Sequence, residues 1–260
     1  YGDLRDLHSF PTRRSSDLIL LSPTPSKIET TKGNFLTPLV VWGNDFSPGF
    51  LTSPTTRQKG IVTNLDFTPT LLTYFRINPP PIVNGRPLHP DRPGKIQELL
   101  TLNQQVVRNS LFRRKSIPLF LPLAAGGLLL LLTFKILLSQ FSPGDLTRLQ
   151  PWFNFFTVFL LTLPTSLHLI SLLPITSLPP FFALSVGVTL LTAFTIHHFQ
   201  GRFPSLRSLP ALILISLVFL DLARGGPFAR TSVFGYDPML GARYYGMGNE
   251  ISGLFLGGIA

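Results

Sequence analysis

The chain divides near residue 116 into two regions that differ in their pattern of hydrophobic and polar positions. Before this point, apolar positions come in short runs separated by Pro, Thr and Gly. After it, long apolar stretches follow one another. A helix of about 20 apolar residues crosses a bilayer. The second region therefore predicts membrane-spanning helices over residues 117–138, 152–173, 179–196 and 209–223, with a fifth beginning at residue 251.

Two of these stretches carry a further expectation. The span over residues 209–223 is short, so it needs help from flanking residues to cross. Prolines such as Pro164 lie inside the apolar stretches, and they predict kinked rather than broken helices.

Short strands and one helix are predicted in the first region. The run TPLVVWG, residues 37–43, is β-branched and closed by glycine, which predicts a buried strand. Downstream, GIVTNLDFTPTLLTYF predicts another strand near residues 60–63 and then a helix. Asp66 or Thr68 is expected to cap that helix, with Pro69 in its first turn.

Proline then interrupts the pattern. The tract NPPPIVNGRPLHPDRPG, residues 78–94, is too rich in proline for regular structure. His89 within it has no partner at metal-ligand spacing, so no metal site is assigned there. Helical spacing returns further on and ends in the basic run FRRK, so residues 93–116 are predicted to form an amphipathic connecting helix.

Composition and charge agree with a membrane protein. The formal net charge is +10, but only 13% of the 260 residues are charged, and the mean hydropathy is +0.33. Basic residues that flank apolar spans explain both values. The aromatic residues lie inside the spans instead of alternating with basic ones, which argues against nucleic acid as a partner. The chain has no cysteine, which excludes disulfides and thiolate metal sites.

The first eighteen residues, YGDLRDLHSFPTRRSSDL, have a different character. They contain neither a sustained apolar face nor the apolar segment of a secretory signal. A widely used short-read sequencing adapter, translated in one frame, gives the same string except for a histidine in place of Leu4. We therefore expect residues 1–18 to be a contaminating adapter translation and the gene to continue upstream of Ile19. The apolar run that ends the chain predicts truncation there as well.

Residues 37–88 contain an ordered set of motifs. A strand with a Pro-hydrophobic start is followed by a loop and a second strand. An Asp-x-x-Pro-Thr helix start, formed by Asp66, Pro69 and Thr70, comes next, and Gly-x-x-Leu at residues 85–88 closes the set. This order resembles the C-terminal part of the alkaline phosphatase, sulfatase and phosphoglycerate mutase superfamily. The resemblance covers about a fifth of the 260 residues.

The resemblance implies an α/β fold and a hydrolytic or transfer chemistry. Members of this superfamily usually hold one or two divalent metals through Asp and His. A Ser, Thr, modified Cys or metal-bound water then attacks a phospho- or sulfo-ester. By resemblance, Asp66, Pro69 and Thr70 are structural residues. Most of the family's metal ligands lie upstream of the matching region, so a divalent metal is implied for an intact active relative and none is expected in the present residues.

One departure from the family pattern leaves two functions open. Many members carry a metal-binding His shortly before the first strand of the set, but the corresponding stretch IETTKGNFLTP contains none. No catalytic residue is therefore assigned. The alternative function is a non-enzymatic multi-pass membrane component for transport or envelope assembly, with a degenerate soluble domain.

The loop before the fifth apolar stretch is the most interesting polar segment of the second region. At its end, directly before an apolar run, lie Arg243, Tyr244, Tyr245, Asn249 and Glu250. Ionisable groups at such a boundary are costly unless they are solvated or paired. These residues form a candidate site for an anionic lipid head group or a sugar-phosphate. The alternative is an ordinary juxtamembrane loop with an aromatic belt.

Two arguments about membrane orientation disagree. If the spans alternate, the first region shares its side of the membrane with Arg108, Arg113, Arg114, Lys115, Arg224, Arg230 and Arg243. The opposite side has Arg148, Arg202 and Arg207, with Lys135 close by. This count places the first region in the cytoplasm. Membrane-linked relatives in the superfamily often act outside, on envelope substrates, and on that ground we expect an extracytoplasmic first region.

The sequence therefore predicts an α-helical multi-pass membrane protein, with four to five spans in residues 117–260, preceded by an incomplete α/β alkaline phosphatase-like domain in residues 19–92. Its expected function is that of a membrane-anchored, metal-dependent hydrolase or transferase of phospho- or sulfo-esters in the cell envelope. With less than half of such a domain, the fragment itself is expected to be inactive. The expected partners are the lipid bilayer and a lipid-linked or sugar-phosphate substrate.

Overall fold

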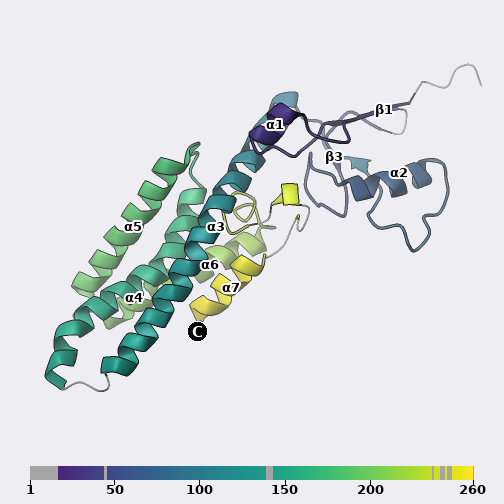
Figure 1. Cartoon of the computed structure of the whole chain (residues 1–260). Coiled ribbons are helices and arrows are strands. Elements are labelled where there is room, and N and C mark those ends of the chain that lie inside the picture. Colours follow the sequence, from purple (N-terminus) through teal and green to yellow (C-terminus); the bar gives the residue numbers. More distant parts are fainter. Residues whose placement is uncertain are drawn as a thin grey trace, which may run out of the picture. The chain divides into compact units, whose positions relative to one another are not determined.

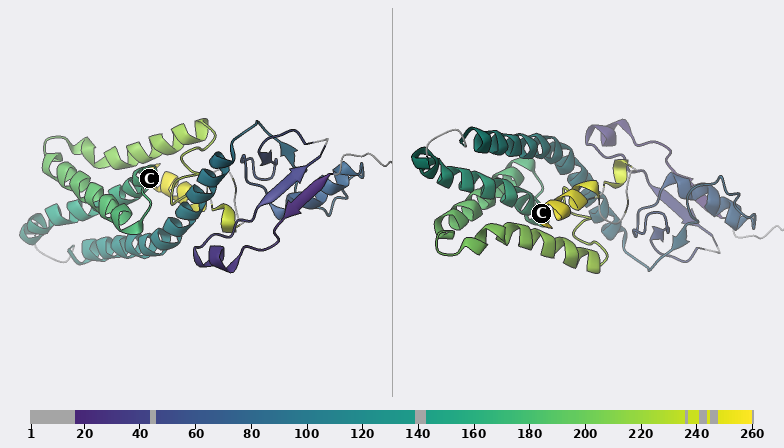
Figure 2. Two further views of the ribbon diagram at one scale, coloured as in Figure 1. Left: turned by 90° about the horizontal axis from the view of Figure 1, so that it is seen from above. Right: turned by 90° about the horizontal axis from the view of Figure 1, so that it is seen from below.

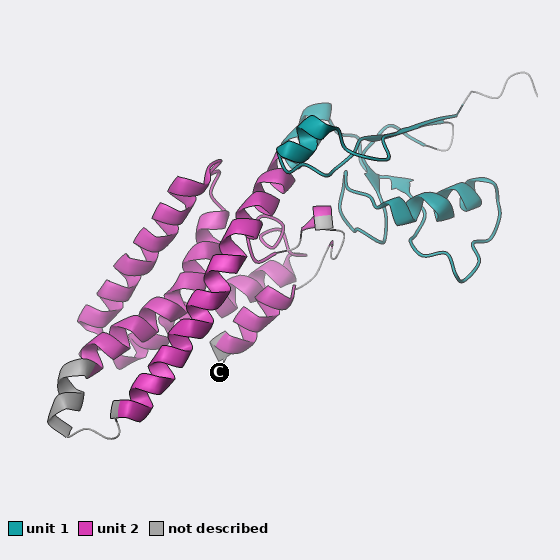
Figure 3. Cartoon of the chain, viewed as in Figure 1, with its two compact units in different colours: residues 1–103 teal, residues 104–260 magenta. Residues whose placement is uncertain are grey.

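The computed structural model describes residues 17–43, 46–138, 143–235, 237–240, 244 and 248–259. The chain forms two compact units, residues 1–103 and 104–260 (Figure 3). The division falls inside a long helix. The expected adapter translation lies outside the described residues except for Asp17 and Leu18.

Unit 1 contains two small antiparallel sheets. β1 (Leu18–Leu21) pairs with β2 (Leu39–Trp42), which confirms the strand predicted from TPLVVWG. Its predicted burial is wrong. Successive side chains of a strand point to opposite faces of the sheet, and one face of β2 is not covered: Val40 and Trp42 are 53% and 69% exposed. β3 (Leu51–Thr52) pairs with β4 (His89–Pro90), which lies within the proline-rich tract.

The strand predicted near residues 60–63 does not form, and one isolated bridge stands in its place. The chain turns instead into a 3-10 helix, η2 (Asn64–Asp66), which leads directly into α2 (Phe67–Tyr74), the predicted helix. Asp66 occupies the N-cap position of α2, but its side chain makes no hydrogen bond to that helix. Thr63 and Asp66 form a capping box around η2.

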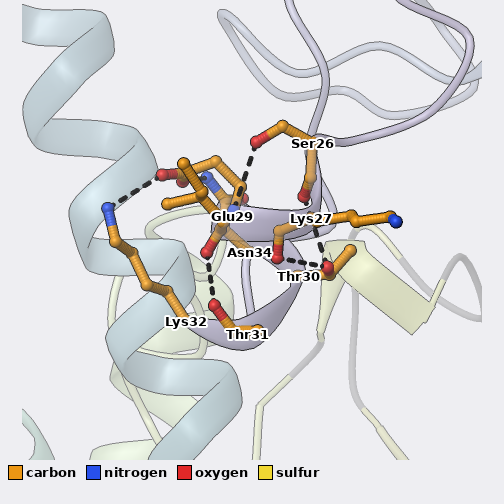
Figure 4. Close-up of polar contacts among 8 residues, drawn as sticks. Ser26, Lys27, Glu29, Thr30, Thr31, Lys32 and Asn34 are labelled. Carbon is orange, nitrogen blue, oxygen red and sulfur yellow. Dashed lines mark hydrogen bonds and ion pairs between the residues drawn. The ribbon is translucent and has the colours of Figure 1, made fainter.

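α1 (Lys27–Thr31) is a single capped turn of helix in unit 1 (Figure 4). Its N-cap, Ser26, accepts a hydrogen bond from the backbone N–H of Glu29 at 3.2 Å. The Glu29 carboxylate accepts bonds from Asn34 Nδ2 at 2.8 Å and Lys32 Nζ at 3.1 Å. These two contacts, the one with Asn34 above all, hold the pKa of Glu29 below its ordinary value. Side chains therefore stabilise a turn that is too short to persist alone.

Helices make up unit 2 (Figure 1). In chain order they are α3 (Ile96–Leu138), α4 (Pro143–Ser171), α5 (Leu178–Phe199), the 3-10 helix η3 (Pro204–Ser208), α6 (Leu209–Ala223), η4 (Pro238–Leu240) and α7 (Asn249–Ile259). α3 begins in unit 1 and continues through unit 2. α4 packs against both α5 and α6, and α6 packs against α7 (Figure 2).

Four helices in the described part of the chain are long and apolar enough to cross a membrane, and they correspond to the first four predicted spans. η3 extends the fourth span to Pro204–Ala223, 20 residues, which is the flanking help that its short apolar stretch needs. α4 continues through Pro151 and Pro164 without a break. α7 covers the predicted start of the fifth span, and its 11 residues extend about 17 Å at 1.5 Å per residue.

The predicted connecting helix and the first predicted span form one helix. α3 runs unbroken through Ser116, although Pro118 and Pro122 lie inside it. Its 43 residues extend about 65 Å, roughly twice the thickness of a bilayer core. Residues 117–138 alone match that thickness, so the preceding half of α3 extends beyond it.

The outer surface of unit 2 is apolar along the spans. Leu128, Leu129 and Leu130 of α3 and Phe194 of α5 are each more than half exposed. Little more than a tenth of the most apolar stretch of α3 is buried, against more than half in α4. Such a surface is unfavourable in water and favourable in lipid. Unit 2 is therefore a helical membrane bundle with α4 in its interior.

Candidate functional site

Asp66 is the centre of a buried polar network in unit 1. Its side chain is fully buried, and the carboxylate accepts hydrogen bonds from Ser53 Oγ at 2.6 Å and Thr55 Oγ1 at 2.5 Å. The backbone N–H groups of Thr63 and Arg86 donate to the same carboxylate at 3.2 and 2.9 Å. These four donors compensate for the burial of the carboxylate.

The network joins the two ends of the predicted motif. Thr70 Oγ1 donates to the Asp66 carbonyl at 2.5 Å and accepts from the backbone N–H of Leu88 at 2.8 Å. Pro69 is fully buried in the same turn of α2. Together with the bond from Arg86 to Asp66, these contacts bind the helix start to the closing turn at residues 85–88.

Gly85 permits this approach of the two backbones. Its φ is +92°, a conformation that L-residues rarely adopt. A Cβ at this position would lie 2.3 Å from the carbonyl oxygen of Leu65. Any side chain at residue 85 would therefore push the closing turn away from η2.

The described residues do not fit a metal site. Both oxygens of Asp66 already accept N–H and O–H bonds, and a cation would have to displace these donors. Across the described ranges, there is no group of three or more His, Asp or Glu that could hold a metal ion. Asp66 therefore acts as a hydrogen-bond acceptor that organises the fold of unit 1.

An irregular segment closes one end of unit 2. Residues 228–235, called the inserted loop below, follow α6 and return into the bundle, where Val233 and Phe234 are almost fully buried. The ring of Phe234 packs edge-on against Phe120 of α3, with 5.3 Å between centroids. Phe120 belongs to the first predicted span, so the inserted loop reaches the level of the spans. Irregular backbone at this depth requires protein groups to satisfy its N–H and C=O groups.

α3 supplies two of these groups from one face. Asn109 Nδ2 donates to the Arg230 carbonyl at 2.8 Å. The guanidinium of Arg113 donates to the carbonyls of Val233, at 3.2 Å, and Gly235. Residues 109 and 113 are four apart, so their side chains lie on the same side of the helix. The side chain of Arg113 is only 17% exposed, and it acts as an internal donor.

The end of α6 supplies an acceptor for the beginning of the inserted loop. The buried carboxylate of Asp221 accepts bonds from the backbone N–H groups of Phe228 at 2.6 Å and Ala229 at 2.8 Å. The loop is so tight that a Cβ at Gly235 would lie 1.6 Å from the Ala229 carbonyl oxygen. Glycine is therefore required where the loop leaves the bundle.

α4 contacts the middle of the inserted loop. Ser171 Oγ accepts a bond from the backbone N–H of Val233 at 3.3 Å. His168 Nδ1 lies 2.8 Å from Ser232 Oγ. The other ring nitrogen of His168, Nε2, is buried without a hydrogen-bond partner among the described residues. Among the described residues that contact the inserted loop, it is the one buried ring nitrogen without a hydrogen bond.

The remaining acidic residues at this end of unit 2 are also engaged. The Asp237 carboxylate accepts a bond from Ser110 Oγ of α3 at 2.7 Å. Glu250, in the first turn of α7, forms an ion pair with Arg113. Asp221, Asp237 and Glu250 are therefore all bound to groups inside the protein.

The residues predicted to form an anionic-substrate loop are described in part. Arg243 and Tyr245 lie outside the described residues. Tyr244 is partly buried, and Asn249 is exposed at the start of α7. Glu250 forms the ion pair with Arg113.

Sequence reasoning did not single out His168, Ser232 or Asp221 as parts of a site. A signal for His168 was present, because an ionisable residue inside a long apolar stretch marks a position of interest. A second signal was the pair of polar residues Asn109 and Arg113, one helical turn apart just before the span. No local pattern indicates which loop groups these side chains bind.

Comparisons with known proteins leave the family unassigned. No protein-family model matches the chain, and no similar curated protein or solved structure is found. The fold itself defines the class: a mostly helical membrane protein, 61% helix, with four candidate membrane-spanning helices in the described part of the chain.

Proposed function

We propose that the chain belongs to a membrane-anchored, alkaline phosphatase-like hydrolase or transferase, dependent on a divalent metal, that acts on phospho- or sulfo-esters in the cell envelope. In this proposal unit 1 is the C-terminal part of the α/β domain, and unit 2 is its membrane anchor. By the resemblance, most of the metal ligands would lie upstream of the matching region, and the described residues themselves do not fit a metal site.

The contact between the two motif segments carries this proposal. Asp66 and Thr70, in the helix start, accept hydrogen bonds from the backbone of Arg86 and Leu88 in the closing turn. Asp66 and Arg86 are 20 residues apart in the chain. Two short matches that arose by chance would not be expected to share one buried network, whereas two parts of one structural motif would.

The polar end of unit 2 supports a membrane-bound substrate. Arg113 pairs with Glu250 and so fixes the start of α7 against α3. This is the point at which the chain returns to an apolar stretch, the level at which lipid head groups lie. A phosphate or sugar-phosphate on a lipid carrier would present its charge at the same level.

The test uses the gene as it occurs in genomic DNA, sequenced upstream of Ile19 and expressed in membranes. We expect the reading frame to continue into an Asp, a Ser or Thr nucleophile and an Asp-His pair. Arg243→Ala should lower turnover of a polyprenyl phosphate, while Arg202→Ala, between α5 and α6, serves as the matched control and leaves it unchanged. A genomic frame that encodes residues 1–18 as written would contradict the adapter interpretation, and it would favour the alternative function.

One observation favours that alternative, a non-enzymatic component for transport or envelope assembly. His168 and Asp221 are buried within unit 2, and ionisable residues among membrane helices often mark transport or proton pathways. His168→Gln in proteoliposomes separates the two functions. A transport component should lose solute or proton flux, whereas an enzyme with its chemistry in the soluble domain should keep its metal-dependent hydrolysis.

A further inference from the structure

We propose that one end of unit 2 binds the head groups of anionic phospholipids through Arg114, Lys115, Arg224 and Arg230, called the basic collar below. All four residues are exposed. The proposal does not depend on the proposed function, since it requires neither a metal nor a substrate.

The charge balance at this end carries the first step. Asp221 binds the backbone of the inserted loop, Asp237 binds Ser110, and Glu250 pairs with Arg113. These acids are used inside the protein. Among the described residues at this end of unit 2, the exposed charged side chains are therefore all basic.

The position of the basic collar along the helices carries the second step. Arg114 and Lys115 directly precede the first span, and Leu119 beyond them is 62% exposed. Arg224 directly follows α6, on which Phe219 is 64% exposed. On α3 and at the end of α6, exposed apolar side chains thus lie within about one or two helical turns of exposed basic side chains. That succession matches the passage from acyl chains to head groups.

The geometry also limits the entropic cost of lipid binding. The backbone of Arg230 is held by the bond from Asn109 to its carbonyl, and Arg114 and Lys115 stand on a continuous helix. Charges fixed in this way lose less freedom on binding than charges on a mobile tail. A basic residue near an anionic membrane surface strengthens binding by about fivefold.

Retention of defined lipids by the full 260-residue chain tests the proposal. The protein in a neutral detergent is mixed with equal amounts of dioleoyl phosphatidylglycerol and dioleoyl phosphatidylcholine, and retained lipids are counted by native mass spectrometry. We expect wild type to retain phosphatidylglycerol at least tenfold more than phosphatidylcholine. R114Q/K115Q and R224Q/R230Q should each lose most of this preference. R202Q/R207Q, which removes two basic residues from the segment between α5 and α6, should keep it.

Three outcomes would overturn the proposal: equal retention of the two lipids by wild type, a preference that survives in both collar variants, or displacement of phosphatidylglycerol by inorganic phosphate at an ionic strength at which NaCl leaves it bound. The last would indicate a site for free anions instead of a lipid surface. If the collar variants do not fold, the salt dependence of wild type decides. A preference that falls from low to high NaCl supports the proposal, and a salt-independent preference contradicts it.

Discussion

Arg113 of α3 and Glu250 of α7 form an ion pair although 137 residues separate them in the chain. The same guanidinium donates to the carbonyls of Val233 and Gly235. One side chain therefore binds a helix start and the inserted loop to α3. Both partners are shielded from solvent, with 17% and 28% of their side chains exposed, so these charge-assisted bonds are stronger than those of a surface pair.

Removing Arg113 should destabilise unit 2 more than removing Glu250. Arg113→Ala leaves two loop carbonyls and one carboxylate without their donor, and we expect a loss of about 3–5 kcal/mol. Glu250→Ala leaves one charge unpaired and should cost about 1–3 kcal/mol. Thermal unfolding in detergent measures both losses. Glu98→Gln is the control, because its 3.9 Å contact with Arg92 is largely exposed and contributes little. Equal shifts for the two alanine variants would contradict this account.

Asp66→Asn tests whether the carboxylate organises unit 1. In the variant, the N–H groups of the Asn amide would face donors that bond to a carboxylate oxygen in wild type. We therefore expect the free energy of unfolding to fall by about 3 kcal/mol. Hydrogen exchange should quicken at the backbone amides of Arg86 and Leu88, which are bonded to Asp66 and Thr70. Thr68→Ala, at an exposed position on α2, is the matched control and should change neither. Unchanged exchange at Arg86 in the Asp66 variant would show that the network is dispensable.

The spans were predictable from the sequence because their length is a local property. A bilayer fixes the number of apolar residues in a helix, and this number can be counted without knowing any partner. It was harder to predict that α3 is one continuous helix. The pattern changes from amphipathic to apolar at residue 116, which changes the surroundings of the helix but does not break its backbone hydrogen bonds. Pro118 and Pro122 then lie inside it.

The candidate site was not predictable in the same way, because its contacts join distant segments. Asn109 binds a carbonyl 121 residues away, and His168 meets Ser232 across 64 residues. The predicted strand near residues 60–63 failed for a related reason, since a short strand needs a partner strand that no local pattern supplies. Asp66 and the closing turn that contains Arg86 were found by their motif, but the motif does not specify the other three donors, which come from Ser53, Thr55 and Thr63.

Acid should loosen α1 through Glu29. Because the pKa of Glu29 is lowered in the folded chain, first by Asn34 and then by Lys32, its ionised form stabilises the turn. This contribution is complete above about pH 4.3, the ordinary pKa of Glu, and is lost as the pH falls through the lower folded value. Hydrogen exchange at the backbone N–H of Asn34, which bonds to the Glu29 carbonyl, should then quicken after correction for its intrinsic pH dependence. The same acid response in Glu29→Gln would assign it to another group.

Single cysteines should report the order of the spans, because the chain has none of its own. Thr31, Ser177 and Ser205 are exposed: two spans separate Thr31 from Ser177, and α5 separates Ser177 from Ser205, which lies in the first turn of the fourth span. In intact cells, a membrane-impermeant maleimide should either label both Thr31→Cys and Ser177→Cys or label neither. Ser205→Cys should give the opposite result from these two. Labelling of the first two from outside would match the expected extracytoplasmic unit 1. Equal labelling of Ser177→Cys and Ser205→Cys would rule out α5 as a span.

The measurement that tests the proposed function most directly is hydrolysis of an aryl phosphate and an aryl sulfate by membranes that contain the product of the genomic gene. The account predicts turnover of at least one ester that requires Mn²⁺ or Zn²⁺, is abolished by EDTA and is restored when the metal is returned. Folded protein with no metal-dependent turnover of either ester would contradict it and leave the membrane component as the function.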